Sequence, residues 1–535
     1  MKYIIVCGGT ISGIGKGVVG SSIAKILDTY GHVVNFIKID PYQHLDCGTI
    51  SPIDHGEVFV LRDGAEVDLD FGSYERLLDV SFTVDNSITT GKIYKEIIKR
   101  EREGKYLGKT VQCVPHVTDL IMEKIIHGAQ KPLKKGIEGD EYVNAEVCMV
   151  ELGGTVGDIE SNIFCEALRQ LKLKVGKENI LFISVDYLPT LSNGEIKTKL
   201  IQNASKKQNL LGINPDIIVC NSSESLDDGI RSKISNFCEV AKDSVFYSPV
   251  VKNTEEIPEI LEKQNIYKII SDQLKLIKKK EGIIKSDNPT EEYDREVSIG
   301  VIGKYTENVD AYLSINKALT FSAQELKTNI KIKYINSDLF EENGNYDLSG
   351  VDGVIIPGGF GSRGTEGKIN AIRIAREQNI PLLGICLGFQ LSVIEFCRNV
   401  LGINDATSAE FDPDSNNPVI IYMGEHNKEI GGTMRLGDVK TYFRREGRVK
   451  KVFNNKEYIT ERHRHRYEVN IKYIEEIEKN GMHFVATDKI GKRMEILEIP
   501  NLKFFVGTQY HPELTARKNK PNKIFTEFLK SSIEE

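Results

Sequence analysis

The sequence predicts an α/β fold of two doubly wound domains, and three observations carry this prediction. The chain has 535 residues, which is more than one hydrophobic core normally supports. Short apolar runs alternate with helical patterns, which is typical of parallel sheets covered by helices on both faces. The alternation stops in a polar, charged stretch at residues 278–296 and then begins again. We therefore predict a first domain at 1–277, a linker at 278–296 and a second domain at 297–535.

The apolar runs give the expected strands in chain order. In the first domain they are 3–7, 33–40, 147–154, 180–189 and 215–221. In the second domain they are 297–305, 353–359, 381–388 and 504–513. The highly charged segment 92–106 is expected to be a surface helix.

Composition and charge exclude several classes of protein. With 40% hydrophobic and 27% charged residues, the chain is an ordinary globular protein. A net charge of −7 argues against a general nucleic-acid binder. Nine scattered cysteines without a CxxC pair favour reduced thiols over disulfides or a zinc site. The apolar run at 3–7 is too short for a signal peptide, and no stretch reaches the ~20 apolar residues of a membrane span. We expect a cytoplasmic (cytosolic) protein with no nucleic acid and no membrane among its partners.

The stretch "CGGTISGIGKG" at 7–17 predicts a phosphate site between the first strand and a helix. Glycines let backbone N–H groups approach phosphate oxygens, and Lys16 adds a positive charge beside them. A standard Walker A motif has Ser or Thr after the lysine, where this chain has Gly17. The loop is therefore a deviant P-loop, and a glycine-rich turn without a ligand remains the alternative.

Carboxylates elsewhere in the first domain are candidate magnesium ligands. Asp68 and Asp70 share one face of an extended segment, and Glu151 ends an apolar strand ahead of a turn that carries Asp158 and Glu160. Such strand ends are where α/β folds bind ligands, and carboxylate oxygens suit Mg²⁺. Any one of these acids is equally well explained as a solvated surface group. The further candidate phosphate contacts are Lys38, Lys197 and Lys199.

The second domain carries a candidate nucleophile in "PLLGICLGFQL", residues 381–391. Cys386 lies where the strand turns into a helix, a corner that exposes a side chain near the helix N-terminus. The glycine-rich turn at 357–368 could bind an oxyanion, and His511 and Glu513 follow a later strand. Cysteine, histidine and a carboxylate form a nucleophile–base–orienter set. The alternative is a buried, inert cysteine.

At these residues the chain resembles known enzymes. "GICLGFQ", "HPE" and "PGGFG" resemble the class I glutamine amidotransferases. "GGTISGIGKG", "SPIDHGEVFVLRDGAEVDLDFGSYER", "VELGGTVGDIES", "GEIKTK", "GGTMRLG" and "ERHRHRYEVN" resemble, in this order, the CTP synthase family. The resemblance implies an amidoligase (synthetase) domain that binds ATP, Mg²⁺ and UTP, followed by a glutamine amidotransferase domain. ATP would phosphorylate O4 of UTP, and ammonia from glutamine would replace the phosphate to give CTP.

The resemblance also implies a role for individual residues. Cys386, His511 and Glu513 would hydrolyse glutamine, and Asp70 and Glu151 would hold Mg²⁺. The implied ATP-binding residues are Gly13, Ile14, Gly15, Lys16, Gly17, Val18, Asp70, Pro249, Val250 and Val251. The implied UTP- and CTP-binding residues are Ser12, Lys38, Asp158, Ile159, Glu160, Lys197, Thr198, Lys199, Gln202 and Lys233. The implied glutamine-binding residues are Gly359, Leu387, Gly388, Phe389, Gln390, Glu410 and Arg466.

The family further implies GTP as an allosteric activator, inhibition by CTP, and a homotetramer (a dimer of dimers) that can form filaments. Two departures from the family pattern concern the UTP site. Leu200 and Ile201 stand where the family has proline and threonine, and His44 replaces an asparagine. His463 and His465 alternate with arginines whose positive charge disfavours a metal site there.

Two other functions are alternatives. The first is another glutamine-dependent amidoligase, such as the type that amidates cobyrinic acid, which would not need the "GEIKTK" lysines. Nucleotide dependence of phosphate release would separate it from CTP synthesis. The second is a filament-forming scaffold with a relic active site, and the complete Cys–His–Glu set argues against it.

Overall fold

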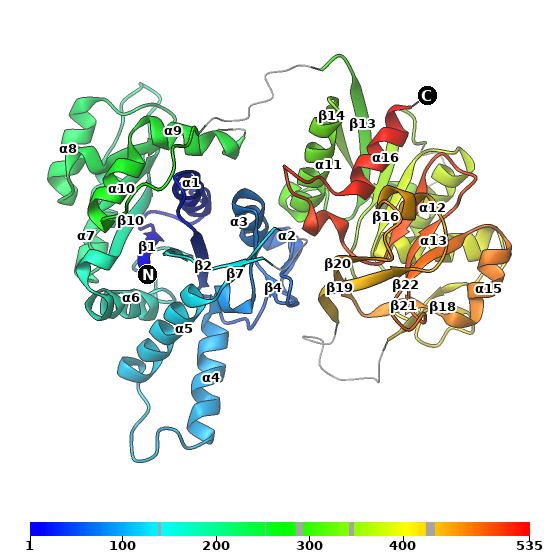
Figure 1. The fold of residues 1–535 in the computed structure, drawn as a ribbon, viewed down its shortest axis with the longest axis horizontal. Helices are drawn as coiled ribbons and strands as arrows, with labels where there is room; N and C mark the ends of the chain where they lie inside the picture. The colour runs from blue at the N-terminus through cyan, green and yellow to red at the C-terminus, as the bar shows by residue number, and fades with distance from the viewer. Residues whose placement is uncertain (137–140, 252, 285–292, 342–346, 424–433, 535) are drawn as a thin grey trace. The chain divides into compact units, whose positions relative to one another are not determined.

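The computed structural model describes residues 1–136, 141–251, 253–284, 293–341, 347–423 and 434–534, and the chain divides into two compact units. Unit 1 comprises Met1–Asp46 and Ser73–Asn288, and unit 2 comprises Cys47–Gly72 and Pro289–Glu535 (Figure 1). We predicted a continuous first domain at 1–277, whereas the segment Cys47–Gly72 packs with the second unit. The predicted linker at 278–296 includes residues 285–292, which lie outside the described residues.

A seven-stranded parallel sheet forms the centre of unit 1. The strand order is β12-β11-β10-β1-β9-β2-β6, and each neighbouring pair runs parallel. All five predicted strands are present, because uninterrupted apolar runs suit a sheet that is covered on both faces. The strands are β1 (Lys2–Cys7), β2 (Val34–Asp40), β6 (Ser87–Thr89), β9 (Val147–Leu152), β10 (Ile180–Tyr187), β11 (Ile217–Asn221) and β12 (Val245–Ser248).

Helices cover both faces of this sheet. On one face, Ile5 and Ile37 pack with Leu120 of α5 and Leu168 of α6 in one buried cluster. On the other face, Gly20 of α1 lies against Val6 and Phe36. The predicted surface helix at 92–106 is α4. The helices of unit 1 are α1 (Lys16–Thr29), α4 (Thr90–Arg102), α5 (Thr118–Gln130), α6 (Asn162–Val175), α7 (Lys199–Leu210), α8 (Asp228–Cys238), α9 (Ile257–Lys263) and α10 (Ile266–Leu274).

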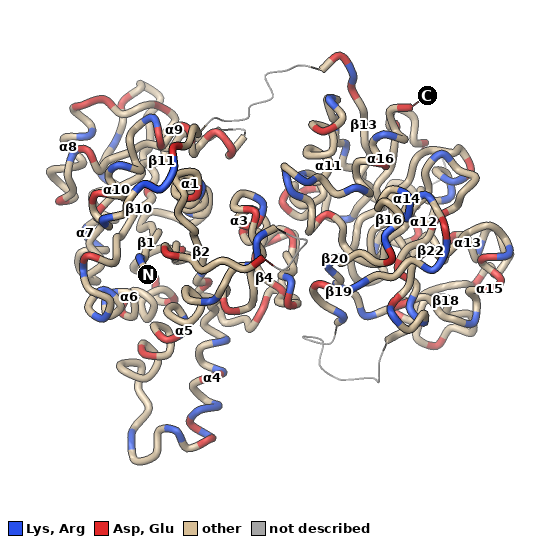
Figure 2. Tube along the Cα trace, in the orientation of Figure 1, with Lys and Arg blue, Asp and Glu red and all other residues tan. Residues whose placement is uncertain are grey.

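Smaller elements complete unit 1. A three-stranded antiparallel sheet contains β5 (Val80–Ser81), β7 (Leu133–Lys135) and β8 (Tyr142–Val143). Helix α3 (Asp70–Leu78) continues from one unit into the other, since the division falls between Gly72 and Ser73. Lysines and arginines are interspersed with aspartates and glutamates along the chain (Figure 2).

A nine-stranded mixed sheet forms the centre of unit 2. The order is β14-β13-β15-β16-β24-β23-β22-β19-β20. The first five strands are parallel. Four of them match predicted strands, whereas β14 was not predicted. The last four continue the sheet antiparallel. The strands are β13 (Glu296–Gly303), β14 (Asn329–Asn336), β15 (Gly353–Ile356), β16 (Leu382–Ile385), β19 (Arg435–Phe443), β20 (Tyr458–His465), β22 (His483–Thr487), β23 (Met494–Glu498) and β24 (Phe505–Thr508).

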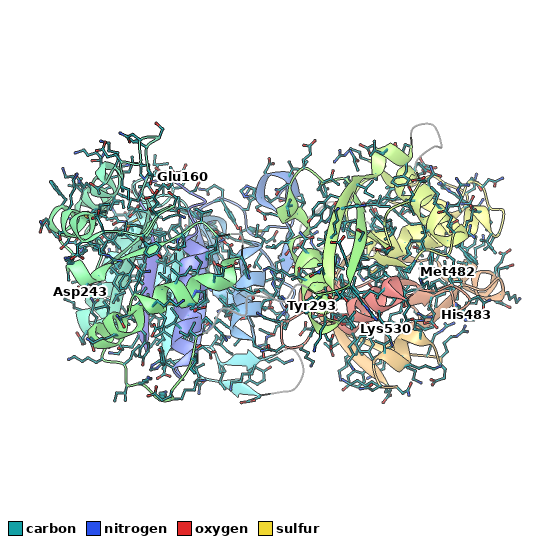
Figure 3. The ribbon with its side chains drawn as sticks, turned by 90° about the horizontal axis from the view of Figure 1, so that it is seen from above. Glu160, Asp243, Tyr293, Met482, His483 and Lys530 are labelled. Carbon is teal, nitrogen blue, oxygen red and sulfur yellow. The ribbon has the colours of Figure 1, made fainter. Side chains whose placement is uncertain are left out.

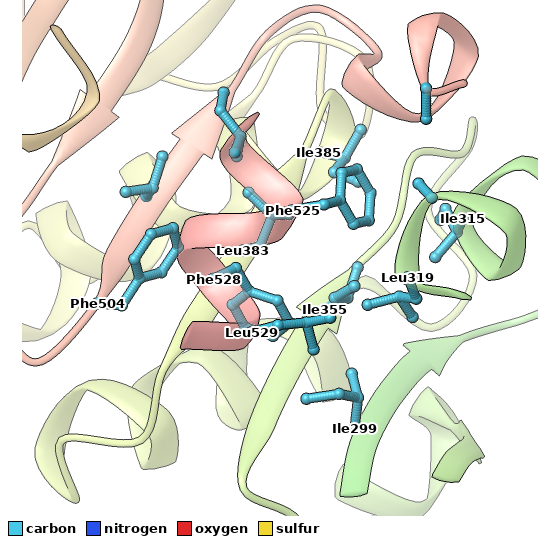
Figure 4. Close-up of a cluster of buried hydrophobic side chains, with 14 of the residues drawn as sticks. Ile299, Ile315, Leu319, Ile355, Leu383, Ile385, Phe504, Phe525, Phe528 and Leu529 are labelled. Carbon is cyan, nitrogen blue, oxygen red and sulfur yellow. The ribbon is translucent and has the colours of Figure 1, made fainter. Parts of the chain in front are cut away.

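Two buried clusters hold helices against the two faces of this sheet. Ile299, Ile355 and Leu383 pack with Leu319 of α11 and Phe525 of α16 on one face (Figure 4). On the other face, residues of α12 and α13 pack against the alternate positions of the same strands. The helices of unit 2 are α2 (Pro52–His55), α11 (Leu313–Glu325), α12 (Thr365–Glu377), α13 (Leu387–Asn399), α14 (Arg448–Val452), α15 (Ile471–Lys479) and α16 (Lys523–Ile533).

The segment Cys47–Gly72 has two short strands that pair with each other. This segment forms the hairpin β3 (Phe59–Val60) and β4 (Glu66–Val67). A second small sheet contains β17 (Thr407–Ser408), β18 (Pro418–Tyr422) and β21 (Tyr467–Val469). Among the described residues, none of the helices has the length and apolar character that crossing a membrane requires.

Candidate functional site

The glycine-rich loop of unit 1 lies between β1 and α1 and is held from several sides. Gly15 has φ 84° and precedes the helix, and a Cβ on Gly9 would lie 2.8 Å from the Cβ of Ala204. The Gly9 N–H donates to Asp186 Oδ1 at 2.9 Å, and Asn221 Nδ2 donates to the Ile14 carbonyl at 2.9 Å. Glycine is thus required here both for a left-handed backbone and for close approach.

Lys16 and the turn after β9 meet at this loop. Lys16 is buried, and its Nζ donates to the Gly154 carbonyl at 2.7 Å. The Val156 N–H donates to the Gly8 carbonyl at 2.8 Å, so the acidic turn and the glycine loop lie side by side. Burial lowers the pKa of Lys16, and the nearby Glu151 opposes that shift. An ammonium held here would gain a favourable partner if an anionic phosphate entered the loop.

Glu151 and Lys38 occupy adjacent strands at the same end of the sheet. They are register partners of β9 and β2, and both are buried. The Tyr74 hydroxyl donates to Glu151 Oε2. Asp70 belongs to unit 2, so its pairing with Glu151 at one magnesium ion stays a prediction. Among the described residues, no group of three or more His, Cys, Asp and Glu side chains is placed to hold a metal ion.

The predicted UTP and CTP residues occupy loops and the starts of helices in unit 1. Asp158, Ile159 and Glu160 are exposed, and Figure 3 labels Glu160. Lys197 pairs with Glu195, while Lys199 and Lys233 are exposed on α7 and α8. In the first turn of α7, Gln202 Nε2 donates to Oγ1 of Thr198, the residue before the helix, at 3.0 Å. Ser12, also predicted to bind UTP and CTP, lies in the glycine loop, whereas Pro249, Val250 and Val251, predicted to bind ATP, follow β12.

The two departures near the UTP site have different surroundings. Ile201 is fully buried in a cluster with Leu188 and Ile218, whereas the Leu200 side chain is 44% exposed. A buried isoleucine anchors the first turn of α7 by packing rather than by a hydroxyl group. His44 offers its main-chain carbonyl to Thr89 Oγ1 at 2.7 Å, a bond that any residue could make.

In unit 2, Cys386 lies at the corner between β16 and α13. Its backbone has φ 52° and ψ −97°, a conformation that residues with a side chain rarely adopt. A Cβ on Gly384 would lie 2.8 Å from the Gly388 main chain, and one on Gly388 would lie 2.1 Å from the Ile356 carbonyl oxygen. The glycines flanking the cysteine are therefore required by close packing, and the corner has the form of a nucleophile elbow.

His511 and Glu513 form the hydrogen-bonded pair that the sequence suggested. His511 Nδ1 and Glu513 Oε1 are 2.7 Å apart, and both side chains are largely buried. Burial lowers the pKa of His511, but Glu513 and Cys386 outweigh burial and raise the pKa to about 10. A Cβ on Gly358 would lie 3.0 Å from the His511 ring and 3.6 Å from the Cys386 Cβ. The glycine-rich turn therefore adjoins both the cysteine and the histidine.

A cavity of about 130 Å³ opens beside these three residues. One wall is the turn Pro357–Phe360, and another comes from Gly48, Ile50 and Glu57 of the distant segment Cys47–Gly72. Glu57 fixes this wall, because its carboxylate accepts from the N–H and hydroxyl groups of Ser314 at the start of α11. Sequence reasoning missed this wall, since nothing local to residues 47–58 indicates a partner some 250 positions away.

The predicted glutamine-binding residues come from four segments of unit 2. Glu410 Oε1 accepts from the Gly361 N–H at 2.8 Å, and the Arg466 guanidinium lies 5.7 Å from the centre of the Phe360 ring. Burial raises the pKa of Glu410, while Lys304 and Arg466 oppose the shift. Gly359, Leu387, Gly388 and Gln390 adjoin the same corner. Phe389 is fully buried in the core against Phe484, so it can offer a ligand only its main chain.

Several residues that the sequence did not single out support the site. Lys304 and Lys368 donate to the carbonyls of Phe360 and Pro357, at the two ends of the glycine-rich turn. Lys368 is fully buried, and burial lowers its pKa to about 7. The Arg464 carbonyl accepts from Cys386 Sγ at 3.5 Å, and the Arg464 side chain pairs with buried Glu66 at 2.8 Å. In the sequence, the only signal for these three residues is that each lies near a recognisable motif.

Comparisons with known proteins bear on both units. A family model described as CTP synthase N-terminus matches residues 2–276, and one described as glutamine amidotransferase class-I matches residues 307–531. CTP synthase 1 of Homo sapiens is 47% identical, over 100% of this chain and 93% of the human protein. The chain belongs to the CTP synthase family. Membership of this family argues against the alternative of an amidoligase of the type that amidates cobyrinic acid.

Other members are similarly close. CTP synthase 2 of Xenopus laevis is 45% identical over 99% of this chain and 94% of its own length. CTP synthase of Candida glabrata is 46% identical over 99% of this chain and 96% of its own length. A solved structure of the Trypanosoma brucei CTP synthase glutaminase domain with bound acivicin is 36% identical, covers 44% of this chain and 93% of that one, and has a TM-score of 0.42. The chain is thus an α/β enzyme with a glutamine-dependent amidoligase and a class I glutamine amidotransferase domain.

Proposed function

We propose that this chain makes CTP from UTP, with ATP to activate the uracil ring and glutamine as the nitrogen donor. The observation that supports this most directly is the pair of sites on one chain of this family. Unit 1 has a lysine-bearing glycine loop, and unit 2 has a cysteine at a strained corner beside a His–Glu pair. The first suits phosphoryl transfer and the second suits amide hydrolysis.

In unit 1, the proposed step activates a carbonyl oxygen that is otherwise a poor leaving group. The ATP γ-phosphoryl group would move to O4 of UTP, and ammonia would then attack C4 and release inorganic phosphate. The loop N–H groups and Lys16 would hold the phosphates, and Lys38 lies on the adjacent part of the sheet edge. Glu151, a buried carboxylate beside this loop, has the hard oxygen atoms that suit Mg²⁺, and we propose Asp70 as a second ligand. Bound there, Mg²⁺ would neutralise phosphate charge.

In unit 2, the proposed step hydrolyses glutamine through a thioester. Because its pKa is raised to about 10, His511 would already hold the Cys386 proton near neutral pH, and the Cys386 thiolate would attack the side-chain amide carbon of glutamine. The electron pair of the C=O bond would move to oxygen, and N–H groups of the turn Pro357–Phe360, which lines the cavity, would stabilise it. Collapse would break the C–N bond, with His511 returning the proton so that ammonia leaves. Water would then release glutamate and restore the thiol.

Further properties are proposed from the family resemblance. They are activation of glutamine hydrolysis by GTP, inhibition by CTP at the residues that bind UTP, and a homotetramer that can form filaments. We also propose a cytosolic location, which is supported by nine cysteines that all occur as free thiols.

The experiment that tests this function measures CTP formed from UTP and ATP with glutamine or with ammonium chloride. We expect both nitrogen sources to support synthesis and neither to do so without ATP. CTP formation that does not require UTP and ATP together, or no CTP from ammonium chloride, would contradict the proposal.

A further inference from the structure

A continuous buried hydrogen-bond network ends at the sulfur of Cys386. It begins at the Tyr467 carbonyl, which can only accept hydrogen bonds. His465 Nδ1 lies 3.0 Å from this oxygen and Gln390 Nε2 lies 3.0 Å from it. Both nitrogens must therefore donate, which fixes the orientation of the Gln390 amide and the tautomer of His465.

The fixed Gln390 amide orients a second buried glutamine. Gln390 Nε2 also donates to Gln509 Oε1 at 3.1 Å, so the oxygen of Gln509 must face Gln390. The nitrogen of Gln509 then faces the other way, and it lies 3.8 Å from Cys386 Sγ. The Gln509 side chain is 1% exposed and its main-chain N–H donates to the Glu495 carbonyl at 2.9 Å, so it has little freedom to turn away.

Two buried histidines extend the network on the far side. Because His465 donates from Nδ1, its neutral ring must accept at Nε2, where His463 Nδ1 lies 3.1 Å away. Burial and then Arg435 lower the pKa of His465 to about 3, and burial with Arg435 lowers that of His463 as well. His463 Nε2 is left as a buried acceptor without a partner among the described residues. The pair is therefore an uncharged support rather than a metal site.

We propose that Gln509 is a further catalytic residue of glutamine hydrolysis, because it donates a hydrogen bond to the Cys386 sulfur. His463 and His465 act with Gln390 as positioning residues that keep this donor in place. The inference rests on the proposed function and assigns a new role within it. A donor aimed at sulfur stabilises the thiolate more than the thiol, and it does so both before attack and when the thioester is hydrolysed.

The test compares Gln509→Met and Gln509→Glu with the wild-type full-length protein. Methionine has a similar length and no donor, so we expect kcat for glutamine hydrolysis to fall about 10- to 100-fold, with KM within about threefold. Glutamate places an acceptor against the sulfur, and we expect a larger fall. Iodoacetamide inactivation of glutamine hydrolysis is measured against pH, and its midpoint should rise by about 1 to 2 pH units in Gln509→Met, because the thiolate then forms less readily.

A matched pair tests the supporting histidines. His463→Asn keeps a donor near the position of Nδ1, whereas His463→Leu removes it. We expect His463→Leu to shift the iodoacetamide midpoint in the direction of Gln509→Met, and His463→Asn to restore it. Hydrogen–deuterium exchange of peptides from β16 and α13 measures how much of unit 2 is folded in each variant.

The outcomes distinguish this inference from the proposed function. If the wild-type protein fails to hydrolyse glutamine, the proposed function is wrong. If the wild-type protein is active and Gln509→Met retains its kcat within twofold and its pH midpoint, the role of Gln509 alone is wrong. If Gln509→Met raises KM and leaves kcat unchanged, the inference is also wrong, because Gln509 would then contribute to substrate binding rather than to stabilising the sulfur.

Discussion

The strained backbone at Cys386 predicts that unit 2 is more stable with glycine at this position than with alanine. Cys386 has φ 52° and ψ −97°. Alanine at this position would keep the strain, whereas glycine adopts such angles readily. Both Cys386→Gly and Cys386→Ala lack the sulfur. The difference between their free energies of unfolding therefore reports only on backbone strain and on the methyl group of alanine.

The magnitude follows from three effects. At an unstrained buried site, glycine would be less stable than alanine by about 1.5 kcal/mol, from greater freedom of the unfolded chain and loss of a buried methyl group. A backbone outlier of this kind costs about 2 kcal/mol in a residue that has a Cβ. Release of that strain reverses the order, and we expect Cys386→Gly to be about 0.5 kcal/mol more stable than Cys386→Ala.

Hydrogen–deuterium exchange in increasing denaturant measures this difference, because peptides from β16 and α13 report on unit 2 separately from unit 1. In parallel, both variants should lose glutamine-dependent CTP synthesis by several orders of magnitude and keep synthesis from ammonia. If Cys386→Gly unfolds about 1.5 kcal/mol more easily than Cys386→Ala, the corner stores no strain. If the ratio of the two synthetic activities is unchanged, Cys386 is a core residue and not the nucleophile.

Three further predictions concern the two sites. Lys16→Ala should abolish CTP synthesis from glutamine and from ammonia alike, and ammonia-dependent synthesis in this variant would contradict the phosphate-loop assignment. Asp70→Asn or Glu151→Gln should lower both activities in a way that high Mg²⁺ partly restores, and wild-type rates at low Mg²⁺ would exclude a ligand role. Because the pKa of His511 is raised from 6.5 to about 10, its contribution to stability is complete below pH 6.5 and is lost as pH rises through 10. Glu513→Gln should flatten this loss between pH 6.5 and 10 in unfolding measurements, and an unchanged slope would show that the carboxylate does not hold the proton on His511.

Nine of the parallel strands could be predicted because their sequences are largely apolar. Three others, β6, β12 and β14, were not predicted, and β14 reads as "NIKIKYIN". Strand β20 could not be predicted in this way, since it reads as "YITERHRH". Its Arg462 and His463 are nonetheless buried, because each finds hydrogen-bond partners inside the fold: Arg462 donates to the Val60 carbonyl at 2.9 Å, and His463 bonds to His465. A polarity pattern cannot predict burial that depends on partners supplied from elsewhere in the chain.

The same limit applies to the sites. Cys386, His511 and Glu513 were found because each lies in a short motif at the end of an apolar strand. Gln509 lies two residues before His511, yet its role depends on which way its amide faces, and that is set by a carbonyl on another strand. Sequence therefore identified the reacting groups, whereas their supports required the packed structure.

The segment Cys47–Gly72 also has a consequence for how the protein is made. Its Glu66 pairs with Arg464, which is 398 residues further along the chain. At about 5–20 residues per second, a ribosome needs roughly 20–80 s to reach that partner. During this time unit 1 can begin to fold, while the polar and apolar groups of the segment Cys47–Gly72 still lack their final contacts. The glutaminase pocket is therefore among the last features to form during synthesis, and a chain that stalls before Arg464 would contain a phosphate loop but no complete site to release ammonia.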